Sequence, residues 1–285
     1  MSALSGKFEQ LCTLSISGIS VKFQLTQLQA YRMNAKTLFI SLITMLALSG
    51  CTKKGPSPNL CPTVCDGLVA YYPFYGDATD KSGNGHDGKV LGATLTKDRN
   101  GYPNHAYELD GDYSQIKLSI KSNIEEDSFT LVVILKPKSI PDSPNRRYGI
   151  VWKGGSGVGA GIGMHPVGTG GFYFDPSSNK EDSHHFNANG RYNKKIETYY
   201  HVVGVADRLK HVSIIYVNGE SEGYHNWPNG DKLSLNSDWS IGNEPLNLKH
   251  GFNGVIDEVR VYNRALSADE VKELYLFTSA FPPAK

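Results

Sequence analysis

The stretch that decides the fold is Phe252-Asn-Gly-Val-Ile-Asp-Glu-Val-Arg-Val-Tyr-Asn-Arg-Ala-Leu-Ser-Ala-Asp-Glu-Val-Lys-Glu-Leu274. Its first half predicts a strand, in which side chains alternate between two faces. Asp257 is then expected on a valine-rich face that points to the core, together with Val255, Val259 and Val261. A carboxylate among valines is costly unless a cation or good hydrogen-bond donors compensate it, so Asp257 needs a partner.

The second half of this stretch predicts a short helix. Ser267 and Glu270 have the spacing of a capping box, in which each side chain satisfies a backbone N–H of the first turn. Val271, Leu274 and Tyr275 follow at the spacing of one apolar face. A lone helix of this length is only marginally stable, so we expect it to dock on a larger body.

The chain's composition favours a β-rich body. Its 285 residues carry a formal net charge of +1, without the basic excess that nucleic-acid binding normally leaves, so no nucleic-acid partner is expected. Thirty glycines and 16 tyrosines suggest many turns and strands. Asn218-Gly219 is typical of a type I′ hairpin turn. Short strands are expected at 68–74, 106–110, 115–118, 128–136, 148–152, 171–174, 199–205, 211–217, 220–224, 240–242 and 255–262, a spacing typical of a sandwich or barrel.

Several short motifs carry a family resemblance over about residues 67–276. They are Gly67-Leu-Val-Ala-Tyr-Tyr-Pro-Phe74, Asp80-Lys-Ser-Gly-Asn-Gly-His86, Leu109-Asp-Gly111, Ser128-Phe-Thr-Leu131, Tyr216-Val-Asn-Gly219, Ile241-Gly-Asn243 and the stretch quoted above. The chain resembles the laminin-G-like, concanavalin A-like jelly-roll family. The resemblance implies an all-β, two-sheet antiparallel jelly-roll sandwich with the first and last strands side by side, here with one short C-terminal helix. It implies no single activity. One departure is Tyr199-Tyr-His201, where the family usually has a tryptophan.

The N-terminal part is predicted to be a targeting segment. Residues 33–50 combine a short basic start, an apolar run that is too short to span a membrane, and a Leu-Ser-Gly-Cys ending. This resembles a bacterial lipoprotein signal, which implies cleavage before Cys51, a lipid on that cysteine and a place in the cell envelope; an uncleaved anchor is the alternative. Thr52 at the next position resembles the outer-membrane pattern. We expect residues 1–32, upstream of Met33, to be an extension that is absent from the mature protein.

Residues 51–66 are predicted to be the lipidated cysteine and a proline-rich tether, residues 67–277 the jelly-roll domain, and residues 278–285 a tail. Cys61 and Cys65 are too few for a structural zinc site, which needs four ligands. In an oxidising compartment they could form a local disulfide, with free thiols or a redox pair as the alternatives.

Asp80-Lys-Ser82-Gly-Asn84-Gly has oxygen-bearing side chains at alternating positions, as in the first half of an EF-hand, although Leu91 stands where a bidentate Glu should be. The family resemblance implies a structural calcium ion held by Asp80, Ser82, Asn84, His86 and Asp257. The alternative is an Asx-turn loop, with Asp257 accepting backbone N–H bonds.

Catalysis is not expected. Val255 and Val259 flank Asp257 where glycosidases of this architecture need further carboxylates, and the histidines form no zinc motif. The glycine-rich run 154–159 is predicted to be a hairpin or loop, because it lacks the other residues of a phosphate loop.

A binding role remains. Tyr224, Trp227 and Asn229 are candidates for carbohydrate contacts, with Tyr173 and Tyr192 as weaker additions; the alternative is that Trp227 packs under its own loop. We expect a cell-surface lipoprotein that binds carbohydrate or mediates adhesion. The alternatives are a structural or protein-interaction lipoprotein without a glycan ligand and an accessory component of a polysaccharide-degrading system.

Overall fold

The computed structural model describes residues 12–16, 19–23, 61–120, 124, 127–143, 146–155, 158–166, 170–176, 188–191, 193–227, 237–245 and 250–280. The chain divides into two compact units, Met1–Gly55 and Pro56–Lys285. The first unit contains an antiparallel hairpin of β1 (Cys12–Ile16) and β2 (Ile19–Phe23). The signal segment 33–50 and Cys51 lie outside the described residues.

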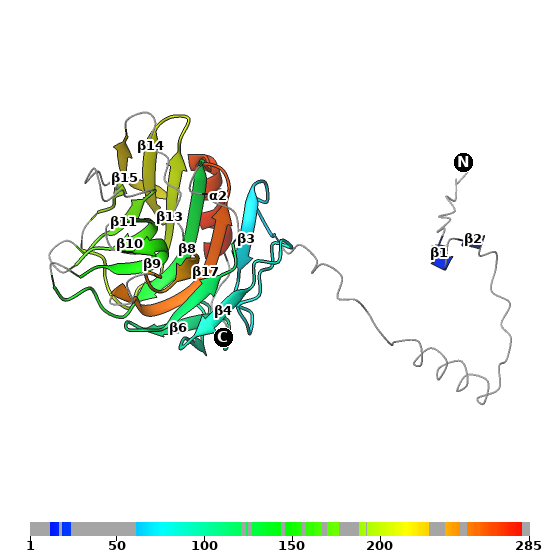
Figure 1. Cartoon of the computed structure of the whole chain (residues 1–285), viewed down its shortest axis with the longest axis horizontal. Helices are drawn as coiled ribbons and strands as arrows, with labels where there is room; N and C mark the ends of the chain where they lie inside the picture. Colours follow the sequence, from blue (N-terminus) through cyan, green and yellow to red (C-terminus); the bar gives the residue numbers. More distant parts are fainter. Residues whose placement is uncertain are drawn as a thin grey trace, which may run out of the picture. The chain divides into compact units, whose positions relative to one another are not determined.

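The second unit contains two antiparallel sheets (Figure 1). One has, within the described residues, seven strands in the order β12 (Ala188–Asn189), β11 (Phe172–Asp175), β10 (Val158–Met164), β9 (Tyr148–Gly155), β16 (Trp239–Ile241), β7 (Gln115–Leu118) and β4 (Gly88–Leu91). The other has eight: β15 (Glu220–Asn226), β14 (Val212–Val217), β13 (Tyr200–Asp207), β8 (Phe129–Pro137), β17 (Asn253–Tyr262), β6 (Ala106–Asp110) and β5 (Thr94–Thr96), with β3 (Leu68–Tyr72) paired to β17.

This arrangement confirms the expected two-sheet jelly-roll-like sandwich, including the first and last strands of the body side by side. The 218–219 turn joins β14 to β15 with positive φ at both Asn218 and Gly219, as a type I′ turn requires. Gly154 and Gly159, from the run predicted to be a hairpin or loop, pair with each other between β9 and β10. Within the second unit, β4, β5, β10 and β12 were not expected, because they are short or glycine-rich and so give little period-2 signal.

Large apolar side chains fill the space between the sheets. Phe129 on β8 packs edge-on against Phe174 on β11 and Trp239 on β16, with ring centroids 5.6 Å and 6.0 Å apart. All three rings are fully buried. These aromatic contacts join one sheet to the other across the inter-sheet core.

Helix α2 (Ala268–Ser279) covers the outer face of the eight-stranded sheet beside β17 and β8 (Figure 1). Ser267 and Glu270 form the expected capping box, and Val271 and Leu274 are buried against the sheet. The helix ends at Ser279, two residues beyond the expected domain limit, and its Thr278 is buried. In the part of the chain that the structure describes, no helix is long and apolar enough to cross a membrane.

The alternation predicted for β17 is wrong at its centre. The pairing of β17 with β8 shifts register between Ile256 and Glu258, so Asp257 is the extra residue of a β-bulge. A one-residue insertion exchanges the faces of everything on one side of it. Ile256 therefore joins Val259 and Val261 in the inter-sheet core, whereas Asp257 and Glu258 both lie on the outer face.

Candidate functional site

A fork in the eight-stranded sheet produces the candidate site. The edge of β17 pairs with β6 over Asn253–Ile256 and with β3 over Val259–Tyr262. Asp257 and Glu258 fall between these two pairings, where neither neighbouring strand covers the edge. A pocket of about 480 Å³ opens there, which we call the tyrosine pocket. Its lining residues are Pro62, Tyr71, Pro73, Tyr75, Asp98, Arg99, Asn100, Tyr102, His105, Asp257, Glu258 and Phe277.

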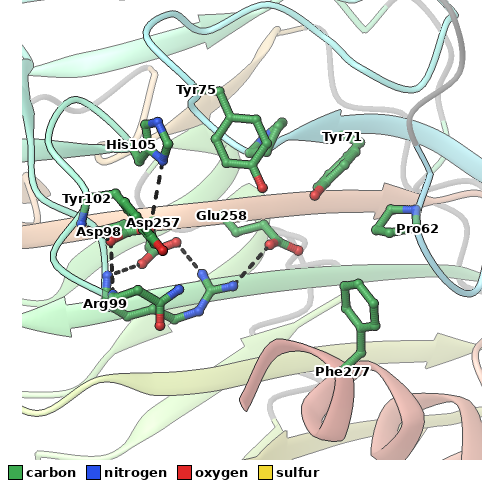
Figure 2. A pocket seen from close by; sticks show the side chains of 12 residues that line it. Pro62, Tyr71, Tyr75, Asp98, Arg99, Tyr102, His105, Asp257, Glu258 and Phe277 are labelled. Carbon is green, nitrogen blue, oxygen red and sulfur yellow. Dashed lines mark hydrogen bonds and ion pairs between the residues drawn. The ribbon is translucent and has the colours of Figure 1, made fainter. Parts of the chain in front are cut away.

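The loop before β6 places Arg99 over the fork (Figure 2). Both Asp257 oxygens are bonded to this one residue: Oδ2 accepts from the Arg99 backbone N–H at 2.6 Å, and Oδ1 accepts from the guanidinium. The guanidinium also lies 3.6 Å from a Glu258 oxygen, and its Nε donates to the Thr278 carbonyl of α2 at 3.2 Å. Arg99 therefore joins the bulge, the loop and the helix.

Glu258 has a second cation behind the pocket wall. Its Oε1 accepts from Arg260 Nε at 2.7 Å, and the Arg260 guanidinium stacks on the Tyr71 ring at 4.6 Å. Arg260 is completely buried, and burial of a charged group is tolerated only when it is paired. The acidic floor is thus fixed from both sides by arginines.

Asp98 shapes the loop that carries Arg99. Its Oδ1 accepts from the backbone N–H groups of Asn100 and Tyr102 at 2.9 Å and 2.8 Å, which folds the chain into a tight turn. The outer part of the pocket is aromatic: the rings of Tyr75 and Tyr102 lie 4.9 Å and 5.8 Å from that of His105. Tyr75 is 57% exposed and Tyr102 47%, so both rings offer surface to a ligand.

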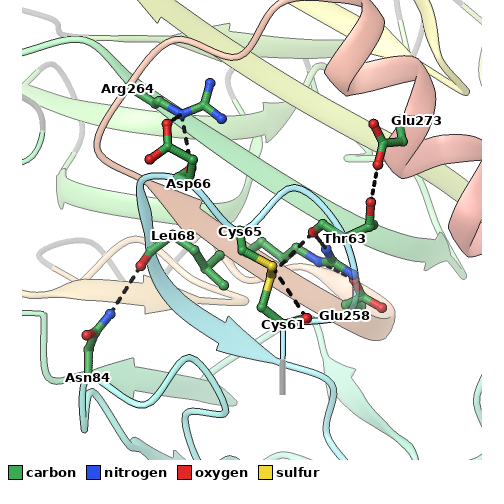
Figure 3. The surroundings of a disulfide bond; sticks show 10 residues. Cys61, Thr63, Cys65, Asp66, Leu68, Asn84, Glu258, Arg264 and Glu273 are labelled. Atoms are coloured by element: carbon green, nitrogen blue, oxygen red, sulfur yellow. Dashed lines mark hydrogen bonds and ion pairs between the residues drawn. A yellow bond between two sulfur atoms is a disulfide. The ribbon is translucent and has the colours of Figure 1, made fainter. Parts of the chain in front are cut away.

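The disulfide-closed segment 61–65 forms another wall (Figure 3). Cys61 and Cys65 are bonded, with their Cα atoms 5.7 Å apart, and Pro62 between them lines the pocket. The Thr63 carbonyl accepts from Arg260 at 3.1 Å, and its hydroxyl donates to Glu273 of α2. One arginine therefore ties this segment to the Glu258 carboxylate of the floor.

Burial raises the pKa of Asp257 to about 7, against the opposing effects of the Arg99 charge and its backbone N–H. Beside the pocket, burial lowers the pKa of His201 to about 3, and the nearby Arg260 and Arg99 act in the same direction. His201 is therefore neutral at physiological pH.

The predicted calcium ligands are engaged by donors of the protein itself. Both Asp257 oxygens are occupied by Arg99. Those of Asp80 accept from the Tyr71, Ser82 and His86 backbone N–H groups and the Ser82 hydroxyl. The two carboxylates accept from different residues, so calcium binding by Asp257 and the Asp80 loop together stays a prediction.

The remaining members of the predicted set are engaged in the same way. The Asn84 side chain donates to the Leu68 and Val69 carbonyls, and the His86 ring contacts the Ser119 carbonyl. Among the residues that the structure describes, no group of three or more His, Cys, Asp or Glu is arranged to hold a metal. The loop is organised as an Asx-turn, which was the alternative; calcium binding itself stays a prediction.

The predicted carbohydrate contacts are not brought together either. Trp227 is only 6% exposed and belongs to the inter-sheet core. Tyr173 is also buried, and its ring packs against that of Trp152. Tyr224 is exposed on β15, whereas Asn229 and Tyr192 lie outside the described residues. Trp227 as a stacking platform is therefore corrected to a core residue, because a large aromatic gains most by burial.

Four residues of the pocket were not expected from the sequence: Asp98, Arg99, Tyr102 and His105. The run Asp98-Arg-Asn-Gly101 is turn-forming, so a loop could have been expected there. Nothing in the sequence indicates that Arg99 of this loop contacts the bulge at Asp257, which lies almost 160 positions later in the chain.

A family model described as the concanavalin A-like lectin/glucanases superfamily matches residues 110–272, and the chain belongs to this superfamily. No curated protein matches its sequence.

Solved structures share the fold at low identity. One is domain 4 of AbnA, a GH43 extracellular arabinanase from Geobacillus stearothermophilus, in complex with arabinotriose; its identity is 20%, its TM-score 0.54, and 73% of this chain and 98% of that one are covered. The binding domain of Paraclostridial Mosquitocidal Protein 1 has 18% identity and a TM-score of 0.59, with coverages of 75% and 53%. The botulinum neurotoxin serotype G binding domain has 17% identity and the same TM-score, with coverages of 75% and 51%. The chain spans about half the length of these toxin domains.

Proposed function

We propose that the chain is a non-catalytic lipoprotein of the bacterial envelope, anchored through Cys51 in the outer membrane, whose tyrosine pocket binds carbohydrate. The observation that carries this proposal is the pocket itself: exposed Tyr75 and Tyr102 rings stand above a floor of fixed carboxylates. A few placed polar groups within a mainly apolar concavity are typical of small-ligand sites.

The two layers of the pocket suit the two sides of a sugar. The apolar face of a pyranose or furanose ring packs on aromatic rings, and its hydroxyls donate to carboxylate oxygens, which only accept when ionised. The AbnA domain, solved with a bound arabinotriose, supports a glycan ligand for this architecture.

The contacts of the acids argue for binding without hydrolysis. A glycosidase needs one carboxylic acid that can give up a proton and a second carboxylate that can attack or activate water. Both Asp257 oxygens are bonded to Arg99, and Glu258 lies between Arg260 and Arg99. The arginine contacts engage the carboxylate oxygens that proton transfer or nucleophilic attack would use.

A glycan array with the detergent-solubilised full chain tests the binding site. Tyr75→Ala and Tyr102→Ala remove exposed rings from the pocket and should each lower the affinity of any glycan hit at least fivefold. Tyr113→Ala and Tyr224→Ala, which remove rings that are 66% and 70% exposed elsewhere, should leave it unchanged. A blank array would favour the structural or protein-interaction role, and loss of binding only in Tyr224→Ala would move the site to β15.

The anchor is tested separately. Mass spectrometry of membrane-extracted protein should find acylated Cys51 as the N-terminal residue, and Cys51→Ser should release the protein from the membrane fraction. An intact peptide from residues 1–50 would contradict this part of the proposal.

A further inference from the structure

A second hollow of about 460 Å³ adjoins the tyrosine pocket on the same face of the eight-stranded sheet. Asp98, Arg99 and Asn100 line both, so these residues form a ridge between them. We call the second one the lysine hollow, because Lys97, Lys136 and Lys138 line it, from the loop after β5, from β8 and from the residue after β8.

The two hollows differ in charge. Apart from Arg99 and Asn100 on the ridge, the tyrosine pocket is lined by carboxylates, aromatic rings and two prolines. The lysine hollow has three ammonium groups and, apart from Asp98 on the ridge, Glu108 as its carboxylate. One end of the combined groove therefore favours neutral, hydroxyl-bearing groups, and the other favours an anion.

The lysines of the hollow can be reached by a ligand. Lys97 is exposed, and Lys138 and Lys136 are paired with Glu108 at 2.5 Å and Glu197 at 3.1 Å. Both glutamates are more than a third exposed, and exposed ion pairs contribute little to stability. An incoming anion can therefore take the place of either glutamate beside its lysine. Lys136 also lies over the Tyr199 ring at 5.4 Å, which gives the hollow an aromatic floor.

We propose that the two hollows form one groove for a linear acidic oligosaccharide, with a sugar ring stacked in the tyrosine pocket and a carboxylate of a neighbouring uronic acid unit in the lysine hollow. This rests on the proposed carbohydrate binding and adds the length and charge of the ligand. A groove of two joined hollows suits an oligomer rather than a single sugar, because binding both parts through one chain makes the second contact intramolecular.

Oligogalacturonate and its methyl ester form a matched pair of probes, since they share one backbone and differ only in whether each carboxyl is charged or carries a methyl group. With the full chain, calorimetry should give at least tenfold tighter binding of the acid than of the ester. A gain of this order is expected from one charge-assisted hydrogen bond. The preference should shrink as salt is raised from 50 to 500 mM, because screening weakens exposed charges.

Variants separate the two hollows. Lys97→Gln and Lys138→Gln should remove most of the preference for the acid and leave binding of the methyl ester unchanged, while Tyr75→Ala should weaken both. Lys89→Gln, on β4 of the other sheet, is the matched control and should change neither. Equal binding of the two probes, or retention of the preference in the lysine variants, overturns the inference while leaving carbohydrate binding intact. Array hits confined to neutral glycans, with neither probe bound, also overturn it. No glycan hit of any kind overturns both.

Discussion

Asp257 is the residue on which the site depends, because the bulge turns it outward and Arg99 neutralises it there. Its need for a partner followed from the sequence, since a carboxylate in an apolar strand is costly. The identity of the partner did not, because a bulge leaves no signature in a period-2 pattern. The face predicted for Asp257 was wrong for the same reason.

Arg99→Ala should therefore be strongly destabilising. The side chain of Asp257 is 4% exposed, and removing one partner of a buried pair costs about 3–5 kcal/mol. Urea unfolding at pH 8 measures the loss of unfolding free energy, and Lys89→Ala, an exposed lysine on the other sheet, is the control. The double variant Arg99→Ala with Asp257→Asn should recover part of the loss; an additive result would mean that the pair is not coupled.

The raised pKa of Asp257 gives a pH dependence with a definite sign. Its pKa rises from 3.8 to about 7 on folding, so between these values the folded state binds more protons than the unfolded state. The free energy of unfolding should fall as the pH rises through this window, with no further loss from this group above it. The charged groups that act on Asp257 are Arg99, Glu258 and Asp98. Asp257→Asn should flatten the slope between pH 4 and 7, measured by urea unfolding; an unchanged slope would assign the titration elsewhere.

At the scale of elements, most strands and the C-terminal helix followed from sequence patterns, because each depends on local periodicity or capping. The Ser267 capping box and the Asn218-Gly219 turn are present as expected. The role of the 61–65 segment as a wall of the pocket could not be predicted from the sequence. It depends on contacts of Thr63 with Arg260 and Glu273, both about 200 positions away.

Opening the disulfide should loosen this wall of the pocket. Cys61→Ser removes a five-residue covalent ring, for which loop entropy predicts a loss of about 2 kcal/mol. Thermal unfolding should show a lower Tm than the wild type, and a reducing agent should lower the Tm of the wild type but not of the variant. A reductant effect of equal size in both would place the sensitive bond elsewhere.

The Asp80 loop tests the calcium prediction directly. If its carboxylate serves the backbone, as its N–H contacts with Tyr71, Ser82 and His86 indicate, a chelator should leave the Tm unchanged. Asp80→Ala should nevertheless cost about 3 kcal/mol, because several buried donors lose their acceptor. Asp77→Ala, at a neighbouring carboxylate that is 55% exposed, should have little effect. A Tm lowered by chelator and restored by calcium would support the metal instead.

At the scale of the whole molecule, the two-layer architecture could be predicted and the fork could not. A series of short strands with turns already favours a sandwich. The fork depends on where β3 stops and β6 starts along β17, which is a matter of tertiary pairing between segments about 150 to 190 positions apart. The site therefore arises from an interruption of the regular pattern that identified the fold.

The close approach of the two sheets gives a prediction for the sandwich as a whole. Gly204 on β13 faces Phe174 on β11 of the other sheet, and a Cβ at Gly204 would lie 2.2 Å from the Phe174 ring. Gly204→Ala should overpack the core and cost about 1–3 kcal/mol in urea unfolding. Phe174→Leu alone leaves a cavity in the same place, so the double variant should be more stable than the sum of the single losses predicts. Strictly additive losses would show that the sheets move apart at this point. The position of the fork on the outer face would then depend less on close packing between the sheets.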